Sequence, residues 1–241
     1  MKNTILDIDR SWDIDLESLD DSYLEFLNND SGYIPTKANI FNAFRTLAKD
    51  DVRYVLFGQD PYPRQQSASG YAFIDSAVKE IFSSNGTLAK EVNRATSLRN
   101  FIKMALVARG DLSLEDISPK AIEQLDKIDL INSIEELKNN FEKNGVLLLN
   151  TALVFTDKKS CKHHAKAWQP FIANLLSSLE GNKVKLILFG NFAKELYRSI
   201  PGILAFEAIE LEHPYNLSFI SNPKAIELFG PMDLMRKIQD K

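Results

Sequence analysis

The chain has few of the residues that build disulfides, metal centres and glycine-rich phosphate loops. Its 241 residues include one cysteine, three histidines and ten glycines. A lone cysteine forms no intrachain disulfide, so we expect Cys161 to be a packed or idle thiol. The adjacent His163 and His164 lack the spacing of metal ligands, and His213 stands alone. We therefore expect neither a metal ion nor another cofactor.

Long apolar runs and an excess of basic residues are also missing. Residues 1–15 carry acidic side chains and no apolar core, which argues against an export signal. No apolar run approaches the roughly 20 residues that span a bilayer. There are 29 Lys and Arg against 33 Asp and Glu, a net charge of −4, which disfavours broad nonspecific binding of polyanions but allows a local basic patch. We expect a soluble, monomeric, cytoplasmic protein.

Four short apolar runs, at 55–57, 146–149, 184–189 and 203–211, predict the strands of a sheet. Helices are expected between and around them, at 19–28, 40–47, 97–108, 122–130, 134–141, 170–179, 192–199 and 231–238. The basic stretch 158–166 is expected to be a loop. Strands joined through helices form parallel sheets with right-handed crossovers. The sequence thus predicts a three-layer α/β/α fold with a central, mainly parallel four-stranded sheet, in a single domain over residues 1–241.

Each apolar run ends in a polar or glycine-bearing turn. The turns are Gln59-Asp60, Asn150, Gly190-Asn191 and His213. Ligands of such sheets bind outside the carboxyl ends of the strands, so Asp60, Asn150 and His213 are expected to converge on one pocket. Taken singly, each could be a turn cap or a structural residue. Their position at matching strand ends favours a site. The chain contains no Gly-x-Ser-x-Gly elbow and no Cys/His dyad.

Three segments, in order, resemble the signature segments of the main uracil-DNA glycosylase family. They are Gly58-Gln-Asp-Pro-Tyr62, Leu147-Leu-Leu-Asn-Thr151, and His213-Pro214 with Leu217-Ser218. Further segments are similar to other parts of the family pattern: Ile34-Pro35, Asn39 to Phe44, Gly70-Tyr-Ala-Phe73, Thr96 to Asn100 with Ser97 at the expected helix N-cap, and His163 with Trp168. The resemblance covers nearly the whole chain.

The resemblance implies a DNA repair enzyme that flips uracil out of single- or double-stranded DNA and hydrolyses its N-glycosidic bond. Asp60 would stabilise the oxocarbenium sugar and orient or deprotonate the attacking water. His213 would donate a hydrogen bond to uracil O2, assisted by the Gln59 backbone N–H. The amide of Asn150 would pair with uracil O4 and N3–H and reject cytosine.

The resemblance also assigns aromatic and DNA-binding roles. Phe73 would stack on the base and Tyr62 would exclude a thymine methyl group, although core packing is an alternative for both. Leu217 would enter the vacated base site as a wedge, or is an ordinary exposed leucine. The residues expected to contact phosphates or the DNA backbone are Ser97, Gly190, Asn191 and Tyr215. His163 is expected behind the catalytic groups.

The chain departs from the family pattern at Pro63, Asn191, Tyr215 and Asn216, where the family usually has His, Ser, Ser and Pro. These positions concern DNA contacts more than base chemistry, so we expect altered or weaker DNA binding with a shallow salt dependence. The expected protein partners are an inhibitor protein that mimics uracil or a replication protein. The preference for single or double strands is not predicted.

Two alternatives remain at this point. One is a catalytically degenerate member that binds DNA or a protein, against which the joint presence of Asp60, Asn150 and His213 argues. The other is an α/β enzyme that acts on a small nucleotide or nucleoside. Uracil release from an oligonucleotide separates the expected activity from the first alternative, and release from free deoxyuridine or its monophosphate indicates the second.

Overall fold

The computed structural model describes residues 7–29, 32–181, 183–200 and 202–238. Their contacts group into two compact units, the first comprising Met1–Asp75 with Gly145–Glu210 and the second Ser76–Asn144 with Leu211–Lys241. Each unit is built from two separate stretches of the chain. Their combination into the single domain expected from the sequence stays a prediction.

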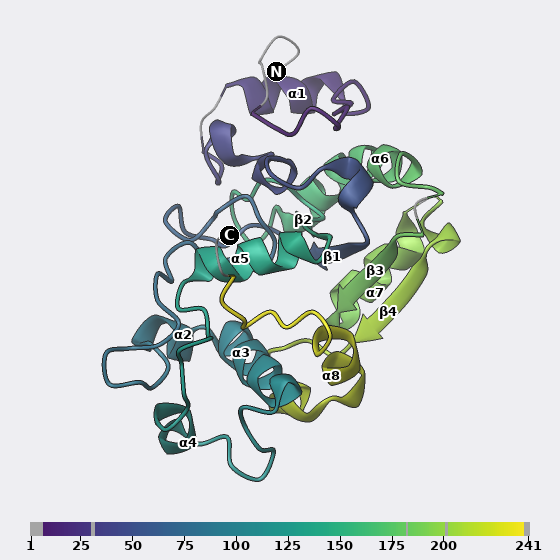
Figure 1. Ribbon diagram of the computed structural model, residues 1–241. Helices are drawn as coiled ribbons and strands as arrows, with labels where there is room; N and C mark the ends of the chain where they lie inside the picture. The colour runs from purple at the N-terminus through teal and green to yellow at the C-terminus, as the bar shows by residue number, and fades with distance from the viewer. Residues whose placement is uncertain (1–6, 30–31, 182, 201, 239–241) are drawn as a thin grey trace. The chain divides into compact units, whose positions relative to one another are not determined.

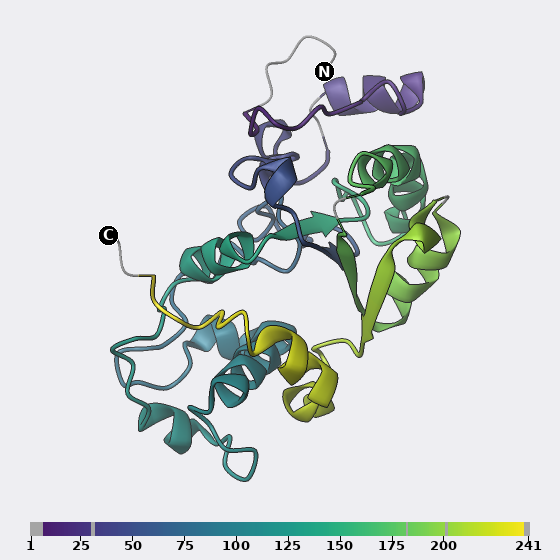
Figure 2. The same cartoon turned by 45° about the vertical axis from the view of Figure 1, so that its right-hand side comes forward.

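A four-stranded parallel sheet forms the centre of the fold, as predicted. Its strands are β1 (Tyr54–Gly58), β2 (Val146–Asn150), β3 (Lys185–Phe189) and β4 (Glu207–Leu211), in the order β2-β1-β3-β4 (Figures 1 and 2). In the register of β1 and β2, Gly58 lies opposite Asn150. The last strand begins later than expected, because Ile203–Ala205 form a 3-10 turn. The α/β class and the parallel sheet are thus confirmed.

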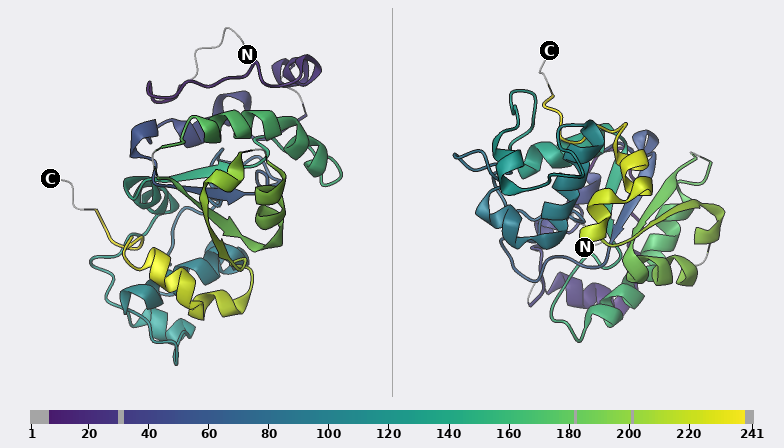
Figure 3. Two further views of the ribbon diagram at one scale, coloured as in Figure 1. Left: turned by 90° about the vertical axis from the view of Figure 1, so that its right-hand side faces the viewer. Right: turned by 90° about the horizontal axis from the view of Figure 1, so that it is seen from below.

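Three α-helices of the first unit are α1 (Asp21–Asn28), α6 (Cys161–Ser177) and α7 (Gly190–Ser199). The left view of Figure 3 shows α6, in green, lying over the sheet. Its apolar residues recur at helical spacing and pack in the same core as one face of the strands. The α6 members of this core are Trp168, Phe171, Ile172, Leu175 and Leu176.

Two sequence predictions in this unit are wrong. The stretch 158–166 is not a loop throughout, because α6 begins at Cys161 and carries Pro170 in its interior. The segment 40–47 is not an α-helix but lies among short 3-10 turns, Lys37–Asn39, Asn42–Phe44 and Lys49–Asp51. The first correction matters for the site, because it places Cys161 in the first turn of a long helix.

The second unit contains α2 (Lys90–Arg94), α3 (Thr96–Arg109), α4 (Pro119–Glu123), α5 (Ile134–Lys143) and α8 (Pro223–Phe229), with a 3-10 helix at Leu217–Ser221. Its core is built around Phe101 of α3. The ring of Phe101 lies 5.0 Å from that of Phe229, 5.6 Å from Phe141 and 6.1 Å from Phe219, measured between centroids. These aromatic contacts fix α3 against α5, α8 and the 3-10 helix.

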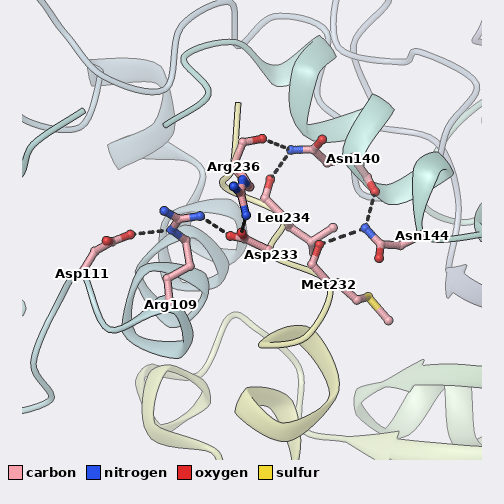
Figure 4. Close-up of polar contacts among 8 residues, drawn as sticks. All are labelled: Arg109, Asp111, Asn140, Asn144, Met232, Asp233, Leu234 and Arg236. Carbon is pink, nitrogen blue, oxygen red and sulfur yellow. Dashed lines mark hydrogen bonds and ion pairs between the residues drawn. The ribbon is translucent and has the colours of Figure 1, made fainter. Parts of the chain in front are cut away.

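The predicted helix at 231–238 does not form. Side-chain amides of α5 bind the carbonyl groups of this segment instead: Asn140 donates to Leu234 and Arg236, each at 2.8 Å, and Asn144 donates to Met232 at 2.9 Å (Figure 4). Arg109 of α3 is paired with Asp111 and Asp233. These side-chain hydrogen bonds hold a segment that runs as turns from 231 to 235.

Across the described ranges of both units, none of the helices has the length and apolar character needed to cross a membrane.

Candidate functional site

The carboxyl ends of β1 and β2 are tied together by three hydrogen bonds. The backbone N–H of Thr151 donates to the carbonyl of Gly58 at 3.0 Å, and that of Ala152 donates to the carbonyl of Gln59 at 3.1 Å. The Thr151 hydroxyl also donates to Gln59 O at 2.7 Å. The turn that carries Asp60 is therefore fixed to the strand end that carries Asn150. The structure brings these two predicted site residues to one edge of the sheet.

Gly58 allows the Asn150 side chain to lie against the end of β1. Asn150 is 3% exposed. A Cβ atom at position 58 would lie 2.3 Å from Asn150 Oδ1 and 2.9 Å from Ala72 Cβ, closer than van der Waals contact permits. The absence of a side chain at 58 thus leaves room for the amide at this position. The sequence marks Gly58 only as the end of a strand and gives no sign of this role.

Asp60 is half-buried and contacts a residue of α6. The thiol of Cys161 donates a hydrogen bond to Oδ2 of Asp60, with Sγ and Oδ2 3.1 Å apart. Burial raises the pKa of Asp60, and the hydrogen bond from Cys161 opposes part of that rise. Cys161 thus makes a specific polar contact that the expectation of a packed or idle thiol does not include.

The segment after the Asp60 turn is held to β2 and to Tyr62. The backbone N–H of Ala72 donates to Leu148 O at 3.0 Å, and the Tyr62 hydroxyl donates to Phe73 O at 3.3 Å. Phe73 has φ of +68°, a conformation that costs a non-glycine residue about 1–3 kcal/mol. Its ring lies 6.1 Å from that of Phe189. Burial is the main cause that raises the pKa of Tyr62, and the charge of Asp75 adds to it. The hydroxyl therefore keeps its proton and stays a donor.

The third strand end leads directly into a helix. Helix α7 begins at Gly190, two residues earlier than predicted, and Gly190 has φ of +72°. Asn191 is exposed in the first turn of this helix. Backbone N–H groups of a first helical turn lack intrahelical acceptors, which makes this end of α7 suited to an anion such as phosphate.

The two adjacent histidines of α6 differ in environment. His163 is exposed, whereas His164 is buried between the hydroxyls of Tyr23, 2.7 Å from Nδ1, and Thr156, 2.9 Å from Nε2. Burial is the main cause that lowers the pKa of His164, and the neighbouring His163 lowers it further. The α6 residue that contacts Asp60 is Cys161, and the role expected for His163 behind the catalytic groups stays a prediction.

In the second unit, His213 follows β4 on the surface. The backbone N–H of Tyr215 donates to Nδ1 of His213 at 3.0 Å. Nδ1 is then the acceptor, so the neutral ring carries its proton on Nε2. Partial burial lowers the pKa of His213, which favours this neutral form at pH 7. Since His213 belongs to the second unit, its convergence with Asp60 and Asn150 stays a prediction.

The segment 213–218, here called the wedge loop, is exposed at its tip: Tyr215 is 66% exposed and Leu217 69%. Asn100 of α3 holds its backbone by donating from Nδ2 to the carbonyls of Pro214, Tyr215 and Asn216 at 2.9, 3.2 and 3.3 Å. The sequence pattern includes Asn100 in a helix-start motif but gives it no role.

Glu212 holds the same loop from its other side. Its carboxylate accepts hydrogen bonds from Asn216 at 3.3 Å, from Ser218 at 2.5 Å and from Asn222, the N-cap of α8, at 2.9 Å. Burial alone would raise the pKa of Glu212, but these three hydrogen bonds together bring it below its ordinary value. No feature of the sequence around Glu212 indicates this role.

Ser97 is not the N-cap of α3. The helix begins at Thr96, with Ala95 in the capping position, and no side chain caps it. Ser97 therefore lies within the first turn, where its hydroxyl is half-buried. Its contact with DNA stays a prediction.

The parallel sheet defines an α/β fold with polar residues at its strand ends, and comparisons with known proteins identify the family. A family model described as the uracil DNA glycosylase superfamily matches residues 44–230. A uracil-DNA glycosylase of Francisella philomiragia is 29% identical over 208 residues, which cover 81% of this chain and 78% of that protein. Uracil-DNA glycosylase 1 of Streptomyces coelicolor is 30% identical over 77% of this chain and 68% of that protein.

Among solved structures, the wild-type UNG crystal structure from Nitratifractor salsuginis matches with a TM-score of 0.93 and 52% identity. The match covers 97% of this chain and 95% of that one. This chain belongs to the uracil DNA glycosylase superfamily.

Proposed function

We propose that Asp60 and Asn150 of the first unit and His213 of the second act together on one uracil that has been flipped out of DNA. The reaction is that of the family: the protein is a monofunctional uracil-DNA glycosylase, which hydrolyses the N-glycosidic bond of uracil and leaves an abasic site for base excision repair. The observation that carries the assignment is the fixed pairing of the Asp60 turn with the Asn150 strand end.

Asp60 acts as the carboxylate of the reaction. Departure of uracil leaves positive charge on the sugar, which a nearby carboxylate stabilises. The raised pKa of Asp60 makes its carboxylate a stronger base toward the attacking water than an exposed aspartate. The two prolines around Tyr62 keep the turn stiff, which limits movement of this group.

Asn150 reads the base. Its amide offers one acceptor and one donor, which match N3–H and O4 of uracil, whereas cytosine presents the opposite pair at these two positions. Gly58 supports this role because it leaves room for the Asn150 amide at the strand end. A buried amide that faces cytosine instead of uracil is left with unpaired polar groups, which makes rejection strong.

Phe73 and Tyr62 shape the remainder of the base site. Phe73 stacks on the pyrimidine, and Tyr62 occupies the space that a thymine methyl group requires. The hydrogen bond from the Tyr62 hydroxyl to Phe73 O supports a coupled role for the two residues.

His213 supplies the hydrogen bond to uracil O2, where negative charge develops as the bond breaks. The Nε2–H tautomer imposed by Tyr215 N–H supports a neutral donor in this role. The backbone N–H of Gln59 assists at the same oxygen.

DNA binding uses residues of both units. The exposed Leu217 enters the vacated base site, and Tyr215 contacts the backbone. Ser97, Gly190 and Asn191 contact phosphates from the first turns of α3 and α7. The motif departures at Pro63, Asn191, Tyr215 and Asn216 alter these contacts and leave the base chemistry in place.

The family binds uracil-containing DNA. The further partners that we propose are an inhibitor protein that mimics uracil or a replication protein. The monomeric state and the cytoplasmic location stay predictions.

The test is uracil release from single- and double-stranded oligonucleotides that contain one uracil. We expect release from DNA by the wild-type chain and its near loss in Asp60→Asn. Oligonucleotide binding without release by the wild type would instead indicate a degenerate binding module, and release from deoxyuridine monophosphate without release from DNA would indicate a small-nucleotide enzyme.

A further inference from the structure

The single cysteine of the chain touches the proposed catalytic carboxylate. Cys161 is the first residue of α6, and its Sγ lies 3.1 Å from Asp60 Oδ2 and 3.5 Å from Asp157 O. Asp60 and Cys161 are 101 positions apart in the sequence, so the contact is made by the fold rather than by chain proximity. An aspartate that must act on water needs one carboxylate oxygen held and the other available.

We propose that Cys161 is a positioning residue for uracil excision, whose thiol holds Oδ2 of Asp60 by a hydrogen bond and leaves the other carboxylate oxygen to act on the attacking water. The inference rests on the proposed role of Asp60. It concerns orientation of the carboxylate, and the thiol itself forms no bond to the substrate.

The thiol is kept in the form that can donate. Burial, and then the neighbouring Asp60, raise the pKa of Cys161 to about 11. At pH 7 the residue is therefore a neutral S–H donor, and a thiolate beside the carboxylate would repel it. A thiol of this pKa is also a poor nucleophile, which suits a structural contact beside a reactive centre.

The turn before α6 holds Cys161 in place. Asp157 accepts hydrogen bonds from the backbone N–H groups of Lys159 and Ser160 at 2.7 and 3.2 Å, and from the Ser160 hydroxyl at 2.9 Å. Asp157 also adds a smaller upward contribution to the pKa of Cys161. On Asp60 itself, burial and the thiol are the influences seen within the described residues. Cys161 thus stands at a hydrogen-bonded helix start, and among the described residues no cation contributes to the pKa of the carboxylate that it faces.

The proposal has a direct consequence for the pH dependence of excision. The hydrogen bond from Cys161 lowers the pKa of Asp60, whereas burial raises it. Removal of the thiol leaves burial unopposed, so the acid limb of the pH–rate profile moves to higher pH. The loss of orientation lowers kcat even where the carboxylate is ionised. We expect a fall of about tenfold in Cys161→Ala, equivalent to about 1.4 kcal/mol.

The contact can be measured without any uracil release. Because Cys161 is the only cysteine among the 241 residues, its rate of alkylation by iodoacetamide against pH reports its pKa alone. We expect the alkylation midpoint of the wild type to fall in Asp60→Asn, since the carboxylate charge is gone. An unchanged midpoint would show that the thiol does not sense Asp60 and would overturn the proposal.

The positioning role is tested by single-turnover uracil release as a function of pH in Cys161→Ala and Cys161→Ser, with Ser177→Ala at the far, exposed end of α6 as the control. We expect Cys161→Ala to lower the single-turnover rate constant at saturating enzyme, leave the affinity for DNA unchanged and shift the acid limb to higher pH. Cys161→Ser retains a donor and should restore most of the rate. Ser177→Ala should match the wild type.

Equal rates and equal acid limbs in the wild type and Cys161→Ala would overturn the positioning role, even with a shifted alkylation midpoint. A wild-type chain that releases no uracil would refute the proposed function instead, and the alkylation experiment would still decide whether the thiol and Asp60 are in contact.

Discussion

The edge of the sheet in the first unit and the wedge loop in the second are built by different means. At the sheet edge, backbone hydrogen bonds join the ends of β1 and β2, and Asn150 is 3% exposed. The wedge loop is exposed and is held by the side chains of Asn100 and Glu212. Groups that read a base need a fixed position, and backbone pairing provides it. The wedge loop, which is expected to enter DNA, is held by side chains, and a single substitution can change one of these contacts without changing the others.

The departures from the family pattern that the sequence resemblance indicates fall in both regions. Two of them, Tyr215 and Asn216, lie in the wedge loop, and the other two, Pro63 and Asn191, follow strands of the first unit. The proline expected at 216 would stiffen the loop. Here Asn216 donates to Glu212, which also binds Ser218 and Asn222. A network of side-chain hydrogen bonds thus takes the place of a rigid residue.

The largest effect is expected from Asp60→Asn at the sheet edge. Uracil release should fall by roughly 10²–10⁴-fold with DNA binding retained, because the amide carries no charge and accepts no proton from water. Single-turnover release and a binding titration measure both quantities. Wild-type turnover in Asp60→Asn would contradict the assignment.

The same variant should be more stable than the wild type at pH 7. The pKa of Asp60 is higher in the folded protein than in the unfolded chain. Asp60 therefore contributes most to the free energy of unfolding at pH values below its ordinary pKa of 3.8, where it is protonated in both states. This contribution is lost as the pH rises through the raised pKa. Ionised Asp60 thus opposes folding at pH 7. Each kcal/mol gained corresponds to a rise in Tm of about 2–4 °C. Thermal unfolding should show the difference at pH 7 and its loss near pH 3.

The next effect concerns base reading by Asn150. Asn150→Asp should relax discrimination against cytosine. The ionised carboxylate lacks the donor of the amide, and the protonated form offers a different pair of hydrogen-bond donor and acceptor.

Gly58→Ala should displace the Asn150 amide without changing its chemistry, since the new Cβ overlaps Asn150 Oδ1. A displacement of this kind costs about 10²-fold in uracil release. Release from uracil- and cytosine-containing oligonucleotides measures both, and unchanged discrimination in Asn150→Asp would refute the role of the amide.

A smaller effect is expected in the wedge loop. Glu212→Gln replaces an acceptor of three hydrogen bonds with a group that both donates and accepts, which loosens the loop. We expect about tenfold weaker binding to duplex DNA. The matched control is Glu227→Gln on α8, an exposed carboxylate whose charge change is the same. Equal losses in both variants would show that charge, not loop geometry, governs the effect.

The smallest effect is the salt dependence of DNA binding. Each neutralised phosphate contributes about −0.9 to the slope of log K against log salt. With a net charge of −4 and polar rather than basic residues at the expected phosphate contacts, we expect a shallow slope. A titration of duplex binding across salt concentrations measures it. A slope typical of six to ten phosphate contacts would contradict the expectation.

The sequence predicts the sheet well because buried parallel strands are short continuous apolar runs, each followed by a polar turn. It fails where the decisive contact is distant. The stretch that precedes Trp168 looks like a charged loop because its early turns have no apolar stripe, yet α6 begins at Cys161. The segment 231–238 has helical spacing, but Asn140 and Asn144 bind its carbonyls.

The candidate site divides in the same way. The position of Asp60 and Asn150 at one edge of the sheet can be predicted because each stands at a strand end, whereas the convergence of His213 with them stays a prediction. Cys161 and Glu212 cannot be predicted, because their importance comes from hydrogen bonds to particular side chains that no local pattern marks. Ser97 illustrates a further limit, since a helix start shifted by one residue removes the expected cap.

The most direct test of the central claim is a crystal structure of the chain with uracil and abasic DNA bound. The account predicts that the Asn150 amide pairs with O4 and N3–H, that His213 Nε2 donates to O2 of the same ring, and that Asp60 faces the C1′ position of the sugar. A uracil ring bound by Asn150 with His213 too far away to reach O2 would contradict it.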